Sequence, residues 1–222
     1  MAASYFDVDG TLVSTNVIQP TLCYLAHQAT PMATLGRLGR AFMQAPTMAV
    51  AELVDRRMFN ELLYGVYEGI SEDRLLLLAG EIFDDVLRPS IFPGARALVK
   101  RSKDQGRRVI FVSGALDFVI RLLAEYLDAD EVIANRLEVK NGFATGKLLK
   151  PVVAGPEKAR LVRDHARFNG HDLDDCYAFS DSYSDVPMLS VVGHPAAVNP
   201  DRRLKLLAKA YSWPSFNLRE KK

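Results

Sequence analysis

The order of strand and helix patterns constrains the fold of this chain more than any other feature. A run typical of a buried strand spans residues 4–8, and a long helical stretch follows it. After residue 93, helix patterns alternate with apolar strand patterns at 109–112, 131–134, 176–179 and 196–198. Strands separated by helices usually pair in parallel, through right-handed crossovers. The sequence therefore predicts an α/β fold with a doubly wound parallel sheet.

The helical stretch interrupts this sheet after its first strand. Residues 15–89 carry apolar residues at helical spacing and almost no strand signal. We therefore expect a core made of residues 1–14 and 90–222, with residues 15–89 inserted as a helical cap domain. Asn141-Gly142 stands between two short strand patterns, which predicts a small β-hairpin flap.

The composition of the chain argues against several classes of function. The 222 residues include 28 Lys+Arg and 27 Asp+Glu, so the formal charge of +1 does not favour nucleic acid or an anionic membrane as partner. No apolar run approaches the roughly 20 residues that span a bilayer, and Asp7 comes too early for a secretion signal. Cys23 and Cys176 lack the spacing of a metal or redox pair. We expect a cytoplasmic protein, and the sequence carries no signal of its oligomeric state.

Two acids directly follow the apolar part of the first strand. Asp7 and Asp9 are two residues apart, so both side chains can leave the strand end on the same side. Gly10 then allows a turn where a side chain would obstruct it. Paired carboxylates of this kind can bind a hard cation and can supply a nucleophile beside an acid/base.

Polar residues also mark the ends of later strands. Ser113 and Gly114 end the second strand, where Ser113 could hold an anion, cap a helix or do both. Lys158 falls in the first turn of a helix, a position that is unfavourable for a cation unless an anion lies nearby. Asp181 and Asp185 follow another strand. Because the carboxyl ends of the strands border the ligand crevice of such a sheet, these residues predict a site for Mg²⁺ and phosphate.

In their order along the chain, these segments resemble the four motifs of the haloacid dehalogenase superfamily. The matching segments are Asp7-Val8-Asp9-Gly10-Thr11-Leu12, Ser113-Gly114, Lys158 and Ser180-Asp181-Ser182-Tyr183-Ser184-Asp185. The helical insertion after the first motif and the hairpin are similar to the phosphoserine-phosphatase-like branch, subfamily IB. The resemblance covers nearly the whole chain outside the cap interior and implies a phosphatase with a C1-type cap.

The resemblance also implies catalytic roles. Asp7 would attack phosphorus and form an aspartyl-phosphate, while Asp9 would protonate the leaving oxygen and then activate water. Ser113, Gly114 and Lys158 would bind the phosphoryl oxygens. The expected activity is the hydrolysis of a small organic phosphomonoester.

The same resemblance implies a metal site. Mg²⁺ would be held by the Asp7 carboxylate, the Asp9 backbone carbonyl and Asp181. Asp185 would arrange the waters of the metal or pair with Lys158, and its position also suits a helix cap. Two alternatives to hydrolysis stay open: phosphoryl transfer to an acceptor other than water, and a non-catalytic protein that binds a phosphate ligand.

The substrate is the least defined part of this prediction. Phosphoserine phosphatases place a Glu shortly after the first motif to bind the amino group of the substrate, whereas residues 14–19 of this chain contain no acid. A buried ammonium without an anionic partner is penalised. Asn16 or Gln19 could instead bind a hydroxyl or carbonyl group. The hypothesis is a neutral or apolar organic phosphate, such as a lipid-derived one.

Other residues of interest are expected to be structural. The four histidines are not spaced as a metal cluster. The arginines of the cap are expected to form a solvated face, namely Arg37, Arg40, Arg56 and Arg57. The aromatic residues and methionines of the cap are expected to form its helix-packing core.

Overall fold

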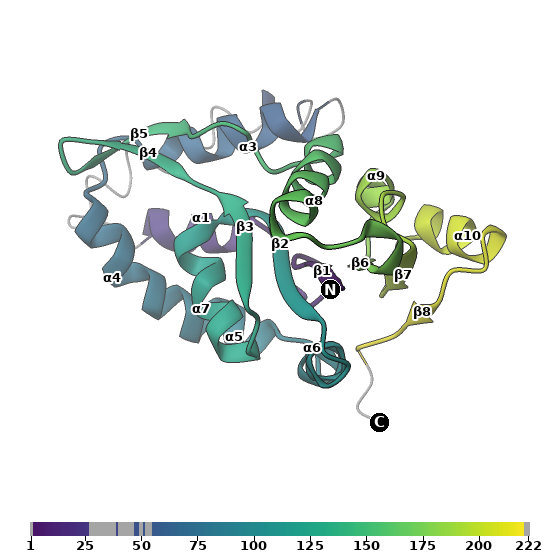
Figure 1. Cartoon of the computed structure of the whole chain (residues 1–222). Helices are drawn as coiled ribbons and strands as arrows, with labels where there is room; N and C mark the ends of the chain where they lie inside the picture. The colour runs from purple at the N-terminus through teal and green to yellow at the C-terminus, as the bar shows by residue number, and fades with distance from the viewer. Residues whose placement is uncertain (1, 27–38, 40–46, 49–50, 52–54, 220–222) are drawn as a thin grey trace.

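A parallel sheet forms the centre of the molecule. The computed structural model describes residues 2–26, 39, 47–48, 51 and 55–219 (Figure 1). Within them, the sheet has the strand order β3-β2-β1-β6-β7-β8, and every pairing is parallel. Its strands are β1 (Ala3–Asp7), β2 (Arg108–Leu116), β3 (Glu131–Asn135), β6 (Tyr177–Ser180), β7 (His194–Val198) and β8 (Ser215–Phe216). The predicted α/β fold is confirmed.

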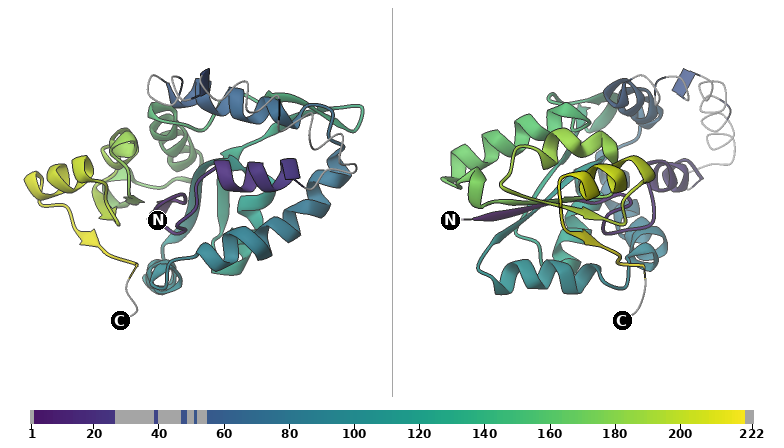
Figure 2. Two further views of the ribbon diagram at one scale, coloured as in Figure 1. Left: turned by 180° about the vertical axis from the view of Figure 1, so that it is seen from behind. Right: turned by 90° about the vertical axis from the view of Figure 1, so that its right-hand side faces the viewer.

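Helices cover both faces of the sheet (Figure 2). Alternate residues of a strand point to opposite faces, and the apolar clusters follow this rule. Phe6 and Phe111 belong to a cluster with residues of α6 (Ala95–Asp104) and α7 (Asp117–Leu127). Tyr5 and Ile110 belong to a second cluster with α8 (Pro156–Asn169), α9 (Val186–Leu189) and α10 (Arg202–Ala210). Both faces are therefore buried, which explains why the central strands are apolar throughout.

The described part of residues 15–89 is helical, as expected. It contains α1 (Ile18–Ala26), α3 (Arg56–Tyr64) and α4 (Glu72–Ile82), and the short α5 (Arg88–Ser90) leads back to the sheet. The buried side chains of α3 and α4 join the same apolar cluster as α7. The division into a core and a cap domain stays a prediction. No helix in the described ranges is both long and apolar enough to cross a bilayer.

A β-hairpin that follows β3 along the chain is hydrogen-bonded to the helical insertion. It consists of β4 (Leu137–Lys140) and β5 (Phe143–Leu148), and its turn residues Asn141 and Gly142 have φ of 53° and 77° as the sequence signal required. The Ala144 N–H donates to the Ile70 carbonyl at 2.8 Å, and the Gly69 N–H donates to the Ala144 carbonyl at 2.8 Å. The hairpin and α3 therefore lie together at the top of Figure 1.

Two elements differ from the expectation. Strand β2 continues through Ser113 to Leu116, four residues beyond the predicted end, so Ser113 lies in the strand. The small residues Ser113-Gly114-Ala115 have weak strand propensity and therefore hid this extension. Strand β8 was not predicted, because it contains only two residues and is defined by its pairing with β7.

Asn135, at the end of β3, joins three segments around the carboxyl edge of the sheet. The side chain is fully buried. Its amide oxygen accepts a hydrogen bond from the Val153 N–H at 2.7 Å, and its amide nitrogen donates to the Gly114 carbonyl at 2.7 Å. It therefore fixes the chain that leads into α8 against the end of β2.

We predict that Asn135→Ala lowers the free energy of unfolding by about 1–3 kcal/mol, because the buried Val153 N–H loses its acceptor. Urea unfolding followed by circular dichroism measures this loss. The matched control is Asn169→Ala, at an exposed position near the end of α8, which should change stability by less than about 0.5 kcal/mol. Equal losses in the two variants would contradict the structural role of Asn135.

Candidate active site

The first acids lie where β1 ends, at the centre of the sheet. Asp7 is the last residue of β1, and Asp9 follows in the turn. Gly10 has a φ of +80°, and a Cβ atom on it would overlap the Asp181 carboxylate, which arrives from the end of β6. Glycine at this position therefore allows the two strand ends to approach each other.

One hydroxyl group joins the carboxylates of the two strands. Thr11 Oγ1 lies 2.9 Å from Asp7 Oδ2 and 3.2 Å from Asp181 Oδ1, and it accepts a hydrogen bond from the Asp181 N–H at 3.0 Å. Its single proton can be donated to only one carboxylate at a time. Thr11 belongs to the first motif, but the sequence analysis gave it no role. The structure shows that it sets the spacing of Asp7 and Asp181.

Lys158 connects the same strand end to a fourth acid. It lies in the first turn of α8, as predicted, and its side chain is buried. Its Nζ is 2.6 Å from Asp7 Oδ1 and 2.9 Å from Asp185 Oδ2. The Ser180 hydroxyl also donates to Asp185 Oδ2, at 2.8 Å. Asp185 occupies the N-cap position of α9, as expected, but its side chain makes no capping hydrogen bond there and pairs with Lys158 instead.

Ser113 contacts Asp9 and is fully buried, whereas its neighbour Gly114 lines the cavity between the sheet edge and the insertion. The Ser113 hydroxyl donates to Asp9 Oδ2 at 3.2 Å and accepts from the Ala115 N–H at 3.0 Å. Because helix α7 starts only after Leu116, Ser113 is not its N-cap. The Gly114 carbonyl accepts hydrogen bonds from Asn135 and from the Tyr64 hydroxyl, the latter at 2.9 Å. The insertion therefore contacts the backbone of the site directly.

The site contains more acidic side chains than basic ones. Burial, followed by the charge of Asp7, raises the pKa of Asp9 to about 7. Burial, with the charges of Asp7 and Asp185, raises the pKa of Asp181 to about 8. Burial also raises the pKa of Asp7, although Lys158 opposes this effect. For Lys158, burial lowers the pKa, but the charges of Asp185 and Asp7 outweigh it and hold that pKa above its usual value.

This excess of negative charge fits a bound divalent cation. The atoms that face each other across Thr11 are carboxylate oxygens of Asp7 and Asp181, and Mg²⁺ prefers oxygen ligands of this kind. Among the described residues, no group of three or more His, Cys, Asp or Glu side chains is arranged to hold a metal ion. The expected ligand set is compatible with this finding, because it combines two side chains, Asp7 and Asp181, with the backbone carbonyl of Asp9.

These residues open into a cavity of about 270 Å³ between the sheet edge and the insertion. Asp7, Asp9, Lys158, Asp181 and Asp185 line its floor. Its side toward the insertion is lined by Thr15, Asn16, Val17, Ile18, Arg56, Phe59 and Asn60. All four predicted motifs thus contribute to one cavity.

The cavity includes residues that the sequence analysis did not assign to the site. Arg56 is exposed, as expected for a solvated face, but it also lines the cavity, and its charge lowers the pKa of Asp9. Arg57 does fit that expectation, since it is exposed and pairs with Asp55 at 3.1 Å. Arg37 and Arg40 lie outside the described residues. Asn16 lines the cavity while its side-chain oxygen accepts from the Ile18 N–H at 3.0 Å; Gln19 is exposed and is not part of the lining.

Known proteins resemble this chain in sequence and in fold. The sequence profile of the haloacid dehalogenase-like hydrolase family matches residues 5–190. Phosphoserine phosphatase SerB1 of Mycobacterium tuberculosis is 34% identical over 220 residues, which cover 96% of this chain and 69% of that protein. A protein of unknown function from Bordetella pertussis Tohama I has a TM-score of 0.83 at 25% identity, over 98% of both chains. A phosphoserine phosphatase in apo form shares the fold, with a TM-score of 0.69 at 20% identity over 100% of this chain and 94% of that one.

We predict that Lys158→Met lowers the free energy of unfolding at pH 7 by about 3–5 kcal/mol, because Asp7 and Asp185 then remain buried without their cation. The loss should shrink at lower pH, because burial raises the pKa of Asp7 and this carboxylate takes up a proton more readily. Urea unfolding at pH 7 and pH 5 in the presence of a chelator measures both effects.

Lys103→Met is the matched control for this variant. Lys103 pairs with Asp128 and Asp130 on the more exposed side of α6, so its loss should cost less than about 1 kcal/mol. A Lys158→Met variant as stable as this control would show that the buried carboxylates do not depend on Lys158.

Proposed function

The chain belongs to the haloacid dehalogenase-like hydrolase family, and we propose that it hydrolyses a small organic phosphomonoester through an aspartyl-phosphate on Asp7, with Mg²⁺. As a phosphatase of this family it requires a nucleophile, an acid/base and donors for the phosphoryl oxygens. The observation that carries the proposal is the position of Asp7, which is held by Lys158 on one oxygen and by Thr11 on the other.

In the first step, a carboxylate oxygen of Asp7 forms a bond to phosphorus as the bond from phosphorus to the ester oxygen breaks. The fixed Asp7 carboxylate needs no reorientation for this attack. Asp9 donates its proton to the departing oxygen, so the product is an alcohol. With a pKa near 7, Asp9 is protonated in a substantial fraction of molecules at neutral pH.

In the second step, the Asp9 carboxylate accepts a proton from water while the water oxygen bonds to phosphorus. The bond between phosphorus and Asp7 breaks, which releases phosphate and restores both carboxylates to their starting states. The insertion lies close to the reacting groups, because the Tyr64 hydroxyl donates a hydrogen bond to the Gly114 carbonyl.

The phosphoryl oxygens need donors that are in place before the reaction. Lys158 and Ser113 would supply a cation and a hydroxyl, and the Gly114 N–H directly follows Ser113 along the chain. Asp7, Asp181 and the Asp9 carbonyl would hold Mg²⁺, which would neutralise charge on the phosphoryl group and on the surrounding carboxylates. Asp185 acts through Lys158, whose position it fixes.

Arg56 refines the substrate class. It is an exposed cation at the mouth of the cavity, and no ion pair of Arg56 occurs among the described residues. The hypothesis of a neutral ester did not include it, and we propose that Arg56 binds a carboxylate or another anionic group of the substrate. The lining contributed by the described insertion residues contains no acid, so a substrate ammonium lacks a partner on that side.

The nucleophile and the metal are tested with one assay. We expect phosphate release from small organic phosphates in the presence of Mg²⁺, loss of release with a chelator, and recovery on adding Mg²⁺ back. Asp7→Asn should reduce kcat by more than about 1,000-fold, because the covalent route disappears. Asp104→Asn, on the exposed end of α6, is the control and should keep native activity. Equal turnover by Asp7→Asn and the native protein would refute the assignment.

The role of Arg56 is tested with phosphoglycolate, which carries a carboxylate, and ethyl phosphate, which does not. Arg56→Gln should lower kcat/KM for phosphoglycolate by about 10- to 100-fold relative to ethyl phosphate, because a charge-assisted hydrogen bond is lost. Arg57→Gln is the matched control, since Arg57 pairs with Asp55 outside the cavity lining. The same relative change in both variants would assign the effect to surface charge instead.

A further inference from the structure

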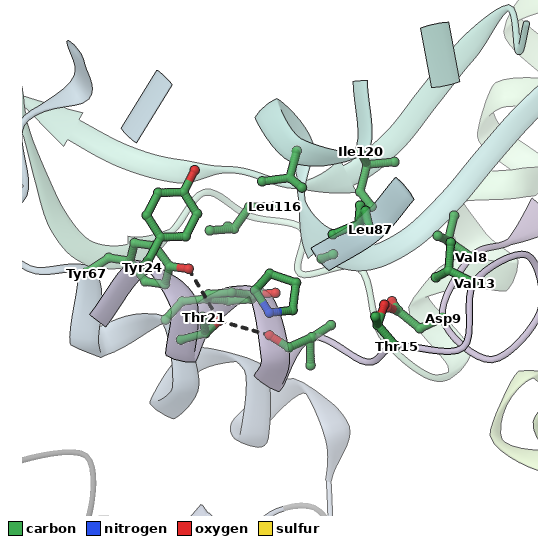
Figure 3. A pocket seen from close by; sticks show the side chains of 15 residues that line it. Val8, Asp9, Val13, Thr15, Thr21, Tyr24, Tyr67, Leu87, Leu116 and Ile120 are labelled. Atoms are coloured by element: carbon green, nitrogen blue, oxygen red, sulfur yellow. Dashed lines mark hydrogen bonds between the residues drawn. The ribbon is translucent and has the colours of Figure 1, made fainter. Parts of the chain in front are cut away.

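A second, smaller cavity adjoins the active-site cavity (Figure 3). It has a volume of about 20 Å³, and it shares Asp9, Thr15 and Val17 with the larger one. The rest of its lining comes from both the insertion and the sheet side of the molecule. Those residues are Val8, Val13, Pro20, Thr21, Tyr24, Tyr64, Tyr67, Leu87, Ala115, Leu116, Val119 and Ile120. A space of this size holds one water molecule or one methyl group.

Most polar groups around this cavity already have partners. The Tyr24 hydroxyl donates to the Leu75 carbonyl at 2.8 Å, and the Thr21 hydroxyl donates to the Val17 carbonyl at 2.9 Å. The Tyr67 hydroxyl lies 3.3 Å from Thr21 Oγ1, and the Tyr64 hydroxyl bonds to Gly114. Each of these four hydroxyl groups therefore already has a hydrogen-bond partner.

Thr15 is the exception. Its side chain is only 6% exposed, and its Oγ1 is buried without a hydrogen-bond partner among the described residues. A buried hydroxyl without a hydrogen-bond partner is energetically unfavourable. Because Thr15 lines both cavities, a ligand that extends from the active site into the smaller cavity would supply the missing partner.

We propose that this small cavity and Thr15 form a subsite for the alcohol part of the substrate, which selects a methyl-sized apolar branch next to the ester oxygen and a neighbouring oxygen that bonds to Thr15. The inference rests on the proposed function, since Asp9 donates its proton to the ester oxygen. The carbon atom bonded to that oxygen must then lie beside Asp9, and Asp9 forms part of the wall of the small cavity.

The small cavity and Thr15 define the substrate class more narrowly than the charge of Arg56 does. In a phosphate ester of a primary alcohol, the one carbon substituent on the ester carbon can enter either the small cavity or the larger cavity. A secondary alcohol fills both, because one methyl group enters the small cavity and the other substituent stays in the larger one. A hydroxyl group on the adjacent carbon reaches the Thr15 side, where it can pair with Oγ1. The preferred alcohols are therefore branched at the ester carbon and carry a vicinal oxygen.

The test compares ratios of kcat/KM within each protein, with ethyl phosphate, isopropyl phosphate and 1-hydroxypropan-2-yl phosphate as substrates. We expect the native enzyme to prefer isopropyl over ethyl phosphate by about 10-fold. The hydroxyl-bearing ester should be preferred over isopropyl phosphate by a further factor of about 5.

Two variants separate the two features of the subsite. Val119→Ile adds one methylene to the cavity wall and should bring the ratio of isopropyl to ethyl phosphate close to 1. Thr15→Val keeps the shape of the side chain and should abolish the preference for the hydroxyl-bearing ester. Val162→Ile, in the apolar cluster on the opposite face of the sheet, is the matched control and should keep the native ratios.

An unchanged isopropyl-to-ethyl ratio in Val119→Ile, or a native preference for ethyl phosphate, would overturn the proposal and leave the cavity as the site of a buried water. If no ester is hydrolysed with Mg²⁺, the proposed function itself fails. The subsite can then still be tested by measuring the binding of two phosphonates by calorimetry. Isobutylphosphonate corresponds to isopropyl phosphate and propylphosphonate to ethyl phosphate, with a methylene group in place of the ester oxygen, so neither probe has to be hydrolysed. Equal affinities of the native protein for both would refute it.

Discussion

The buried contact of Lys158 with Asp7 and Asp185 is the interaction on which the rest of the site depends. It joins the end of β1, the first turn of α8 and the turn after β6. Removing three charged groups from water is costly, and an apolar cluster of similar volume would hold these segments together as well. The contact is therefore better explained by chemistry than by stability: Lys158 opposes the effect of burial on the pKa of Asp7 and orients this carboxylate where a phosphoryl group is expected to bind.

The second constraint is the meeting of the helical insertion with the sheet edge. The Gly114 carbonyl accepts from both Asn135 and Tyr64, so the backbone of the second motif is fixed from the core and from the insertion together. The hairpin adds backbone hydrogen bonds to the insertion at Ile70 and Ala144. The position of the insertion is therefore coupled to the groups that would bind phosphate. The insertion also supplies the part of the cavity lining that would face the alcohol part of the substrate.

Much of this arrangement could be predicted from the sequence, because strand ends in a parallel sheet converge by geometry. The order of strands and helices was enough to predict that Asp7, Asp181 and Lys158 lie together. Ser113 was misplaced within its element, since small polar residues hide the end of β2. Asp185 was ambiguous because the same position suits a cap and an ion pair, and only the location of Lys158 decides between them. Arg56 and Thr15 reach the cavity through the packing of the insertion, which no local pattern encodes.

The central claim is that Asp7 becomes transiently bonded to phosphorus. The most direct measurement is acid quenching of the native enzyme during turnover with Mg²⁺, followed by peptide mass spectrometry. We predict one additional phosphoryl group on the peptide that contains Asp7, removable by hydroxylamine and absent from Asp7→Asn. Phosphate release with the added group on a different residue, or with no phosphorylated peptide at all, would contradict the account.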